Sequence, residues 1–360
     1  MSTTFFSFLI VLGILIFVHE LGHFLVAKLS GIGVEKFSLG FGPKLVAKKV
    51  GMTEYRISAI PLGGYVKLVG ESPDQEISDD LKNISFTSKS VGVRSLVVVA
   101  GPVFNLLLAF IVYFLLYLTI GVTMPVAEVG KIMEGSPAER AGLRPNDVIT
   151  SINGANVESW DVMTRLVAES KGATLKLEIS RANKIMDLAV TPEPTTAKNM
   201  FREDIKTYRI GIQWSGQLKS REIGIVGAFS ESLGTIWEVT RLTFISIGKM
   251  IQGKISPKEN LAGPIMIAHM AGEQARAGIP NLISFIGFLS IALGILNLLP
   301  IPILDGGQLA FFGIEAIMRK PVNPKLRENA QRVGFIMLGS LMIYVIYNDI
   351  ARLVTKNVVE

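Results

Sequence analysis

Four stretches of the chain contain no Asp, Glu, Lys or Arg, and they constrain its fold more than any other feature. These stretches are residues 1–18, 95–127, 277–304 and 333–348. A helix needs about 20 apolar residues to cross the hydrocarbon core of a bilayer. The first stretch reaches this length by continuing past His19, and the fourth by continuing past Asp349. The sequence therefore predicts a polytopic α-helical membrane protein with four transmembrane helices, at about 5–27, 95–122, 279–299 and 333–353.

The basic residues indicate how these helices are oriented. The chain has a formal net charge of +6. Lys28, Lys36, Lys44, Lys48, Lys49 and Arg94 flank the first two spans, and Arg319, Lys320, Lys325, Arg327 and Arg332 lie between the last two; these residues belong to the segments 28–94 and 319–332. Because cytoplasmic loops are enriched in Lys and Arg, both segments are predicted to lie in the cytoplasm. Residues 124–278 and both termini are then predicted outside it. Basic residues that flank spans indicate a lipid bilayer as partner and no nucleic acid. The absence of cysteine excludes disulfides and thiolate ligands.

The cytoplasmic segment after the first span contains a strand pattern. Residues 53–69 carry β-branched and aromatic residues on both sides of a Pro-Leu-Gly-Gly sequence at 61–64. This pattern is typical of a β-hairpin. The turn is unusually apolar for a loop in water, so we expect the hairpin to dip back toward the membrane.

The segment outside the cytoplasm changes to short strands and turns. Residues 135–143 are Gly-Ser-Pro-Ala-Glu-Arg-Ala-Gly-Leu, and residues 146–154 are Asn-Asp-Val-Ile-Thr-Ser-Ile-Asn-Gly. They predict a helix start, a tight turn and a strand, and residues 125–193 resemble a PDZ domain of the bacterial type. The resemblance implies a groove beside a strand edge that accepts an extended peptide or its C-terminus. A small β domain without a ligand is the alternative.

Residues 194–278 are predicted to form a linker and an amphipathic helix at the outer membrane surface. Eight apolar side chains of residues 225–251 fall within about 100° of one another on a helix, and Glu231, Glu238 and Lys249 fall on the opposite side. The eight are Val226, Phe229, Leu233, Ile236, Trp237, Phe244, Ile247 and Ile251. Such a helix lies on a membrane surface or packs on a neighbouring domain. The uncharged stretch 260–272 is too short to cross, so we expect it to be interfacial or re-entrant.

The first span contains residues that can hold a metal ion. His19, Glu20 and His23 belong to an HExxH motif. Residues four apart on a helix share a face, so both imidazoles can bind one ion, and Glu20 can take a proton from a water beside it. Ionisable groups inside a membrane are costly and usually functional. This cost argues against the alternative that the motif merely ends the span.

A third ligand is predicted near the end of the third span. Catalytic zinc usually has three protein ligands and one open position. Pro300 and Pro302 break the helix there, and Asp305 follows with two glycines that allow a tight turn. The sequence thus places a carboxylate on a non-helical backbone at membrane depth. Taken alone, the same stretch is equally compatible with a loop that leaves the membrane.

Together these features resemble the site-2 protease family of intramembrane zinc metalloproteases, in particular its bacterial RseP-type group. HExxH in the first span, the PDZ-like segment, and the sequence Asn-Leu-Leu-Pro-Ile-Pro-Ile-Leu-Asp-Gly-Gly at 297–307 carry the resemblance, and residues 61–67 and 100–105 also match motifs of the group. The resemblance extends along nearly the whole chain. RseP itself has two tandem PDZ domains, whereas this chain has room for one.

The resemblance implies roles for individual residues. One Zn²⁺ per chain would be bound by His19, His23 and Asp305, with Glu20 as the catalytic residue. The substrate-binding residues would be Asn297, Pro300, Pro302, Gly63 and Gly64. Asn105, in the second span, is interpreted as a helix-packing residue in preference to a substrate contact.

The implied function is cleavage of single-pass transmembrane proteins within the membrane, in regulated intramembrane proteolysis. Anti-sigma factors and signal-peptide remnants are substrates of this kind. The implied location is the bacterial cytoplasmic (inner) membrane. The chain then has four parts: a membrane domain at 1–124, a PDZ domain at 125–193, a linker and amphipathic helix at 194–278, and a membrane domain at 279–360.

Two other functions are compatible with parts of this pattern. One is a metalloprotease that cuts soluble segments at the membrane surface, and the depth of His19 within the first span disfavours it. The other is a non-catalytic membrane scaffold that presents a PDZ domain. A scaffold has no need of Glu20 beside two histidines at ligand spacing.

Overall fold

Four helices in the described part of the chain are long and apolar enough to cross a membrane, in agreement with the four predicted spans. They cover Thr3–Leu29, Val91–Thr119, Ile279–Leu298 and Pro324–Arg352. A computed structural model describes residues 2–71, 78–199, 201 and 203–359. The corresponding helices are α1 (Ser2–Leu29), α2 (Val91–Thr119), α8 (Ile279–Leu298) and α10 (Pro324–Val359). α10 begins earlier than predicted because its polar first turns contain good helix formers such as Lys325 and Arg327.

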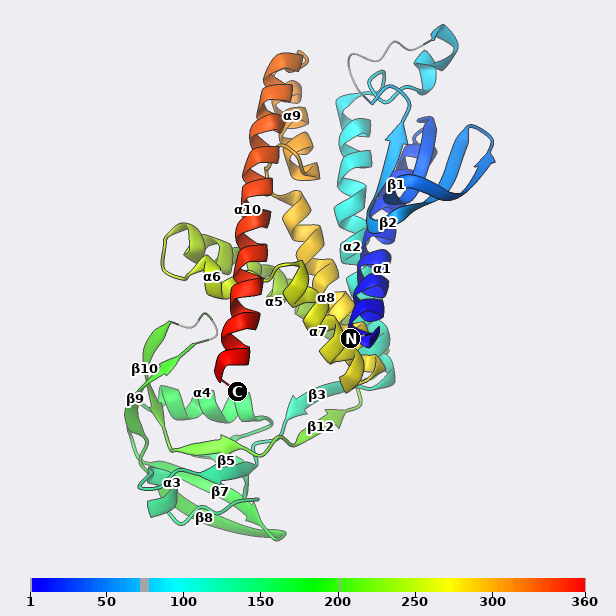
Figure 1. The fold of residues 1–360 in the computed structure, drawn as a ribbon. Coiled ribbons are helices and arrows are strands. Elements are labelled where there is room, and N and C mark those ends of the chain that lie inside the picture. The colour runs from blue at the N-terminus through cyan, green and yellow to red at the C-terminus, as the bar shows by residue number, and fades with distance from the viewer. Residues whose placement is uncertain (1, 72–77, 200, 202, 360) are drawn as a thin grey trace. The chain divides into compact units, whose positions relative to one another are not determined.

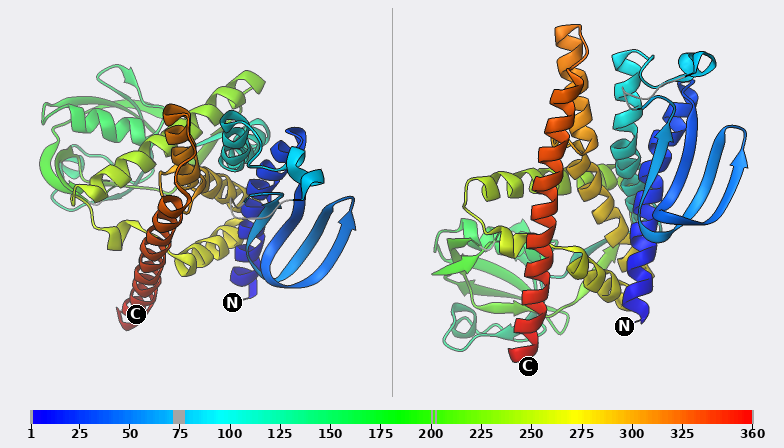
Figure 2. Two further views of the ribbon diagram at one scale, coloured as in Figure 1. Left: turned by 90° about the horizontal axis from the view of Figure 1, so that it is seen from above. Right: turned by 45° about the horizontal axis from the view of Figure 1, so that its top comes forward.

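The chain divides into two compact units. The helical unit comprises Met1–Leu116, Ser230–Ile247 and Pro257–Glu360, and the β unit comprises Tyr117–Phe229 and Gly248–Ser256. Within the helical unit, α1 and α2 lie side by side, the strands β1 (Val34–Val50) and β2 (Thr53–Leu68) lie beside α1, and α10 lies on the other side, next to α9 (Asp305–Met318) (Figures 1 and 2). A buried apolar cluster that includes Ala27, Val34, Val97 and Phe312 joins α1, β1, α2 and α9.

The polar residue in the fourth span has a structural partner. Asp349 of α10 is only 1% exposed. Its carboxylate accepts hydrogen bonds from the backbone N–H groups of Gly263 at 3.1 Å and Met266 at 3.0 Å, at the start of α7 (Pro264–Ala277). These N–H groups have no partner within their own helix, and a carboxylate is favoured at a helix N-terminus. The stretch 260–272, expected to be interfacial or re-entrant, thus lies partly in a helix that α10 caps, preceded by the short α6 (Pro257–Asn260).

The predicted β-hairpin at 53–69 is wrong in its pairing. Residues 54–57 do not pair with 64–68; they pair with residues 36–39 of β1. Residues 64–68 pair with the other edge of that part of β1, residues 34–39. The distal part of β1, 44–50, pairs with 53–58. The Pro-Leu-Gly-Gly sequence therefore connects two strands that flank β1. Residues 64–68 form a sheet edge, since the only pairing recorded for them among the described residues is with β1.

The β unit contains more strands than the segment 125–193 predicted. Its central sheet has the order β6-β5-β7-β8, and β4 pairs with β11, β3 with β12, and β9 with β10. The strands are β3 (Val122–Pro125), β4 (Val129–Ile132), β5 (Val148–Ile152), β6 (Ala155–Asn156), β7 (Leu175–Arg181), β8 (Lys184–Val190), β9 (Glu193–Lys198), β10 (Asp204–Arg209), β11 (Ile212–Trp214) and β12 (Leu218–Arg221). Residues 193–221, most of which were expected to be linker, are thus part of this fold.

Local predictions in the β unit agree with the structure. The run 135–154 forms the helix start, turn and strand that were expected: α3 (Pro137–Arg140), with Ser136 accepting a hydrogen bond from the Glu139 N–H, and then β5. A second helix, α4 (Trp160–Glu169), covers a core that includes Ile149, Leu177 and Ile179. Two further helices belong wholly or mostly to the helical unit. The predicted amphipathic helix forms as α5 (Ile225–Ile251), and a short 3₁₀ helix, η1 (Asp79–Ile84), precedes α2.

A buried ion pair fixes the turn before β5. The Asp147 carboxylate is fully buried and accepts two hydrogen bonds from the Arg181 guanidinium and one from the Arg144 N–H, each at 2.7 Å. Burial raises the pKa of Asp147, but the hydrogen bonds from Arg181 and Arg144 outweigh it and hold the pKa below its usual value. The pair therefore stabilises the folded unit at neutral pH. This contribution is lost only as the pH falls below the unfolded-state pKa of about 3.9 and through the lowered folded-state value.

Candidate metal centre and catalytic site

Three side chains from two distant parts of the chain meet inside the helical unit. Nε2 of His19 lies 3.2 Å from Nε2 of His23 and 3.1 Å from Oδ2 of Asp305, and Nε2 of His23 lies 3.6 Å from the same oxygen. The two histidines are on α1 and Asp305 is the first residue of α9. This is the one group of possible metal ligands found among the described residues.

The chemistry of these atoms fits a bound cation. Oδ2 of Asp305 is buried and has no hydrogen-bond partner. Nδ1 of His23 donates a hydrogen bond to the Val97 carbonyl at 2.9 Å, so Nε2 of the neutral ring carries a lone pair. Electron-rich atoms of both imidazoles and the carboxylate therefore face one another in a buried site. Their mutual repulsion is relieved by a metal ion, and three such ligands are the usual set for a catalytic zinc.

One face of α2 contacts both imidazole rings. Val97, Gly101 and Asn105 are four residues apart and therefore share a helix face. Val97 binds His23 as described, and the Asn105 amide lies 3.2 Å from Nδ1 of His19. Gly101 lies against the rings, since a Cβ there would be 2.3 Å from Nε2 of His23 and 2.8 Å from Cε1 of His19. α2 thus orients the two rings through the Val97 carbonyl and the Asn105 amide, and it leaves space for them at Gly101.

The backbone of Asn105 is bound by a third helix. The residue is fully buried, and its backbone carbonyl accepts a hydrogen bond from Oγ of Ser290 on α8 at 2.7 Å. If His19 binds a metal through Nε2, its Nδ1 carries the proton and needs an acceptor. The amide oxygen of Asn105 can fill this role, because amide O and N positions are assigned from the hydrogen-bond network.

Asp305 is positioned by a break between α8 and α9. α8 ends at Leu298, and Pro300 and Pro302 follow in the break, as predicted. The two glycines after Asp305 do not form the expected turn, because both belong to α9. They allow close packing: a Cβ on Gly306 would lie 2.3 Å from the carbonyl oxygens of Leu298 and Leu299, and one on Gly307 would lie 2.1 Å from that of Ile301. The first turn of α9 therefore packs directly against the backbone that connects α8 to α9.

The edge strand 64–68 lies beside Glu20. A Cβ on Gly64 would be 3.1 Å from Cγ of Glu20, and the Val66 backbone N–H lies near the Glu20 carboxylate. The Leu68 N–H also points away from β1, to a Glu71 carboxylate oxygen at 3.3 Å. Alternate backbone groups of this edge therefore face away from the sheet, and the Val66 group faces Glu20.

The remaining predicted site residues have other surroundings. Gly63 has a φ of 109°, and a Cβ there would lie 2.0 Å from the Phe41 ring, so this position requires glycine. Asn297 is half-buried in the last turn of α8, and no hydrogen bond of its amide is recorded among the described residues. Pro300 is exposed, and Pro302 packs against Gly334 of α10. The structure therefore brings together His19, Glu20, His23, Asp305 and Gly64, and records no contact of the other four with the metal ligands.

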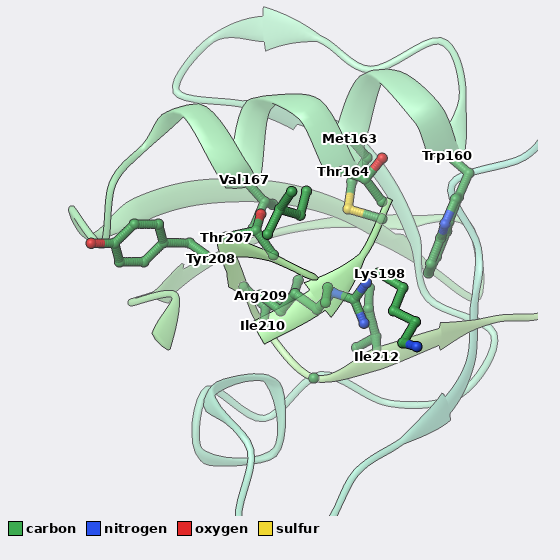
Figure 3. Close-up of a pocket in the computed structure, with 13 residues that line it drawn as sticks. Trp160, Met163, Thr164, Val167, Lys198, Thr207, Tyr208, Arg209, Ile210 and Ile212 are labelled. Atoms are coloured by element: carbon green, nitrogen blue, oxygen red, sulfur yellow. The ribbon is translucent and has the colours of Figure 1, made fainter. Parts of the chain in front are cut away.

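A separate cavity of about 360 Å³ lies in the β unit. Met163, Thr164 and Val167 line it from α4, and residues 207–212 line it from the opposite side (Figure 3). β11 begins at the end of this segment, and β4 is the one neighbour recorded for it among the described strands. The cavity thus lies between a helix and a segment that continues into an edge strand. Arg209 and Lys198 add two cations to its lining.

Comparisons with known proteins agree with this site. The sequence profile of Peptidase family M50 matches residues 7–341. The chain is 37% identical over 340 residues to a "putative zinc metalloprotease" of Clostridium acetobutylicum, covering 94% of each chain. It is 35% identical over 362 residues to a similarly named protein of Mesorhizobium japonicum, covering 96% of this chain and 98% of the relative. It is 30% identical over 427 residues to the zinc metalloprotease RasP of Oceanobacillus iheyensis, covering 98% of this chain and 99% of the relative.

These names agree with the expected zinc cofactor, and both the coverage and the identity are high enough to decide the family. The chain is a metalloprotease of peptidase family M50, the site-2 protease family that its motifs predicted.

Proposed function

We propose that this membrane metalloprotease binds one Zn²⁺ through His19, His23 and Asp305 and cleaves transmembrane segments of single-pass membrane proteins. The observation that carries the proposal is the meeting of these three side chains beside Glu20. Glu20 and both histidines belong to an apolar helix long enough to span a bilayer. Zinc, when bound, acts as a Lewis acid on the scissile carbonyl and makes water more acidic. Glu20 then takes a proton from the attacking water and delivers it to the leaving amine.

Replacing Asp305 with Asn should weaken zinc binding strongly and abolish cleavage, because a neutral amide is a poor metal ligand. Asn105→Leu should weaken zinc binding less, by about 10- to 100-fold, because it removes only the acceptor that orients His19. Both variants are measured by zinc content and chelator competition, together with cleavage of one tagged transmembrane substrate. Full zinc content in Asp305→Asn would exclude Asp305 as a ligand. Unchanged zinc affinity in Asn105→Leu would show that Asn105 is only a packing residue.

The substrate is proposed to add as a strand to the edge at 64–68. A helical substrate must unwind to expose its scissile carbonyl, and pairing with a strand edge replaces the lost hydrogen bonds. The support is the closeness of Gly64 and Val66 to Glu20. Asn297, Pro300 and Pro302 are proposed to hold the unwound segment from the side of α8 and α9, and Gly63 to shape the strand edge.

Strand addition can be tested on the substrate without changing the enzyme. A Val66→Pro variant would be ambiguous, because the Val66 N–H also contacts Glu20. Synthetic transmembrane substrates with a single N-methyl group at successive backbone positions should instead show inhibition at alternate positions, because only every second N–H faces the neighbouring strand. The measurement is the cleavage rate of each peptide. Equal inhibition at adjacent positions would argue for a different binding mode.

The β unit is proposed to be a PDZ domain whose peptide groove is the cavity beside α4. Support comes from the motif at 135–154 and from the cavity's position between a helix and an edge-strand segment. An extended peptide or C-terminus would bind there, with Arg209 and Lys198 attracting a carboxylate.

The exposed Thr164 provides a test of this groove that avoids the core. Thr164→Trp should block capture of peptides from a proteome digest by the full chain, whereas Arg165→Trp, one residue further and outside this cavity, should not. Equal capture by both variants would exclude this groove.

We infer a location in the bacterial cytoplasmic membrane, with both termini and the β unit outside the cytoplasm. The basic segments between spans support this orientation. Figure 1 also supports it, since the start of α1 and the end of α10 lie toward the same end of the helical unit.

A further inference from the structure

A second polar site lies in the helical unit, away from the metal ligands. It is a cavity of about 260 Å³ lined by residues near the start of α2, the end of α9 and the start of α10. Its lining combines two arginines and one glutamate with apolar side chains such as Phe311 and Val322. The mechanism proposed above uses none of these residues.

The two arginines of this cavity both lie near the Phe312 ring, and Arg94 also pairs with a carboxylate, that of Glu315. Arg94 lies 4.9 Å and Arg327 lies 6.0 Å from the ring centroid of Phe312. Arg94 is committed to protein partners, because its Nη2 donates to Glu315 at 2.5 Å and its Nε donates to the Lys89 carbonyl at 3.2 Å. No hydrogen bond or ion pair of the Arg327 side chain is recorded among the described residues, although the carboxylates of Glu71 and Glu315 lie close enough to act on its charge.

In the proposed membrane location, the two arginines lie near the depth of the lipid headgroups. Arg94 and Arg327 each belong to the first turn of a membrane span, one beginning at Val91 and the other at Pro324. The exposed Lys320 and Lys325 flank the cavity in the sequence and add to its positive potential. Basic pockets between transmembrane helices at this depth attract the anionic headgroups of lipids.

We propose that this cavity binds the phosphate group of an anionic phospholipid. A guanidinium group matches the oxygens of a phosphate with two parallel hydrogen bonds, and the free Arg327 can provide them. The apolar lining suits the part of the lipid next to its headgroup. A phosphate diester carries one negative charge, opposite in sign to that of the Arg327 guanidinium. The site does not depend on the catalytic assignment, only on the membrane location.

The test measures lipid retention by the full-length protein. Delipidated protein in detergent is titrated with phosphatidylglycerol or with phosphatidylcholine, and bound lipid is counted by native mass spectrometry. The wild type should retain one phosphatidylglycerol in preference to phosphatidylcholine. Arg327→Gln should lower that affinity by about fivefold or more. Arg332→Gln is the matched control, because Arg332 lies on the same helix but pairs with Glu328 at 2.6 Å and does not line the cavity.

A second variant guards against a general loss of structure. Arg327→Lys keeps the charge but loses the planar fork, so it should retain an intermediate affinity. Equal binding of the two lipids, or equal affinity in Arg327→Gln and wild type, would overturn the proposal. Binding of inorganic phosphate by the delipidated protein as tight as that of the lipid would overturn the lipid as ligand and leave a soluble phosphate in its place.

Discussion

Replacing Glu20 with Gln is expected to lower the rate of peptide cleavage by about 10²- to 10⁴-fold, the usual contribution of a general base. Glutamine has nearly the same shape and can still accept a hydrogen bond, so the site should keep its structure. It cannot accept the proton of the attacking water. Zinc content should stay at one ion per chain, because the three side chains that meet at the proposed metal position are those of His19, His23 and Asp305.

The measurement combines zinc content by mass spectrometry with cleavage of a tagged transmembrane substrate. Glu35→Gln is a suitable control, since Glu35 pairs with Lys67 at 2.7 Å on the same sheet and has no proposed catalytic role. Loss of zinc in Glu20→Gln would make Glu20 a ligand. Retention of full activity would require a different base.

Replacing Gly101 with Ala is expected to remove the zinc site although it adds only one methyl group. The new Cβ would lie 2.3 Å from Nε2 of His23, far inside contact distance. The His23 ring cannot easily retreat, because its Nδ1 is bound to Val97 on the same helix face. The variant should therefore lose zinc affinity by about 100-fold or more, beyond the usual effect of changing a residue that orients a ligand.

The control for this prediction lies on the same helix. Gly92→Ala introduces the same methyl group near the start of α2, where nothing lies within 4 Å. It should leave zinc affinity and cleavage unchanged. Zinc affinity is measured by chelator competition, and helix content by circular dichroism. If Gly101→Ala binds zinc as the wild type does, the packing of α2 on the histidines differs from that described above.

Much of this protein follows from local patterns that are visible in the sequence. The four spans were predictable because each helix must satisfy its own backbone in lipid and therefore needs a long apolar run. His19, Glu20 and His23 were predictable because their relation is set by the helix period alone. Asp305 was recognisable only through the motif around it, because its distance from the histidines depends on how two separate helices pack.

The features that were wrong or missed all depend on contacts between distant segments. The pairing of 64–68 with β1 was missed, since a hairpin with the nearer strand is equally compatible with the pattern at 53–69. The strands at 193–221 were mostly taken for linker because short strands of mixed composition are defined by their partners in a sheet. Asp349, which is unexpected in a span, is explained only by the N-terminus of α7 that it caps.

The sequence by itself determined the membrane-spanning helices, the protease family and the residues that can bind a metal. Only the tertiary structure decided what surrounds those residues. In the sequence, Gly101 has no role beyond its place in the motif at 100–105, and packing is favoured for Asn105. Their contacts with the histidine rings become visible only when α2 is placed against α1. The physical reason is that ligand spacing is a property of one helix, whereas the space for a ring and the acceptor for its proton are properties of two helices in contact.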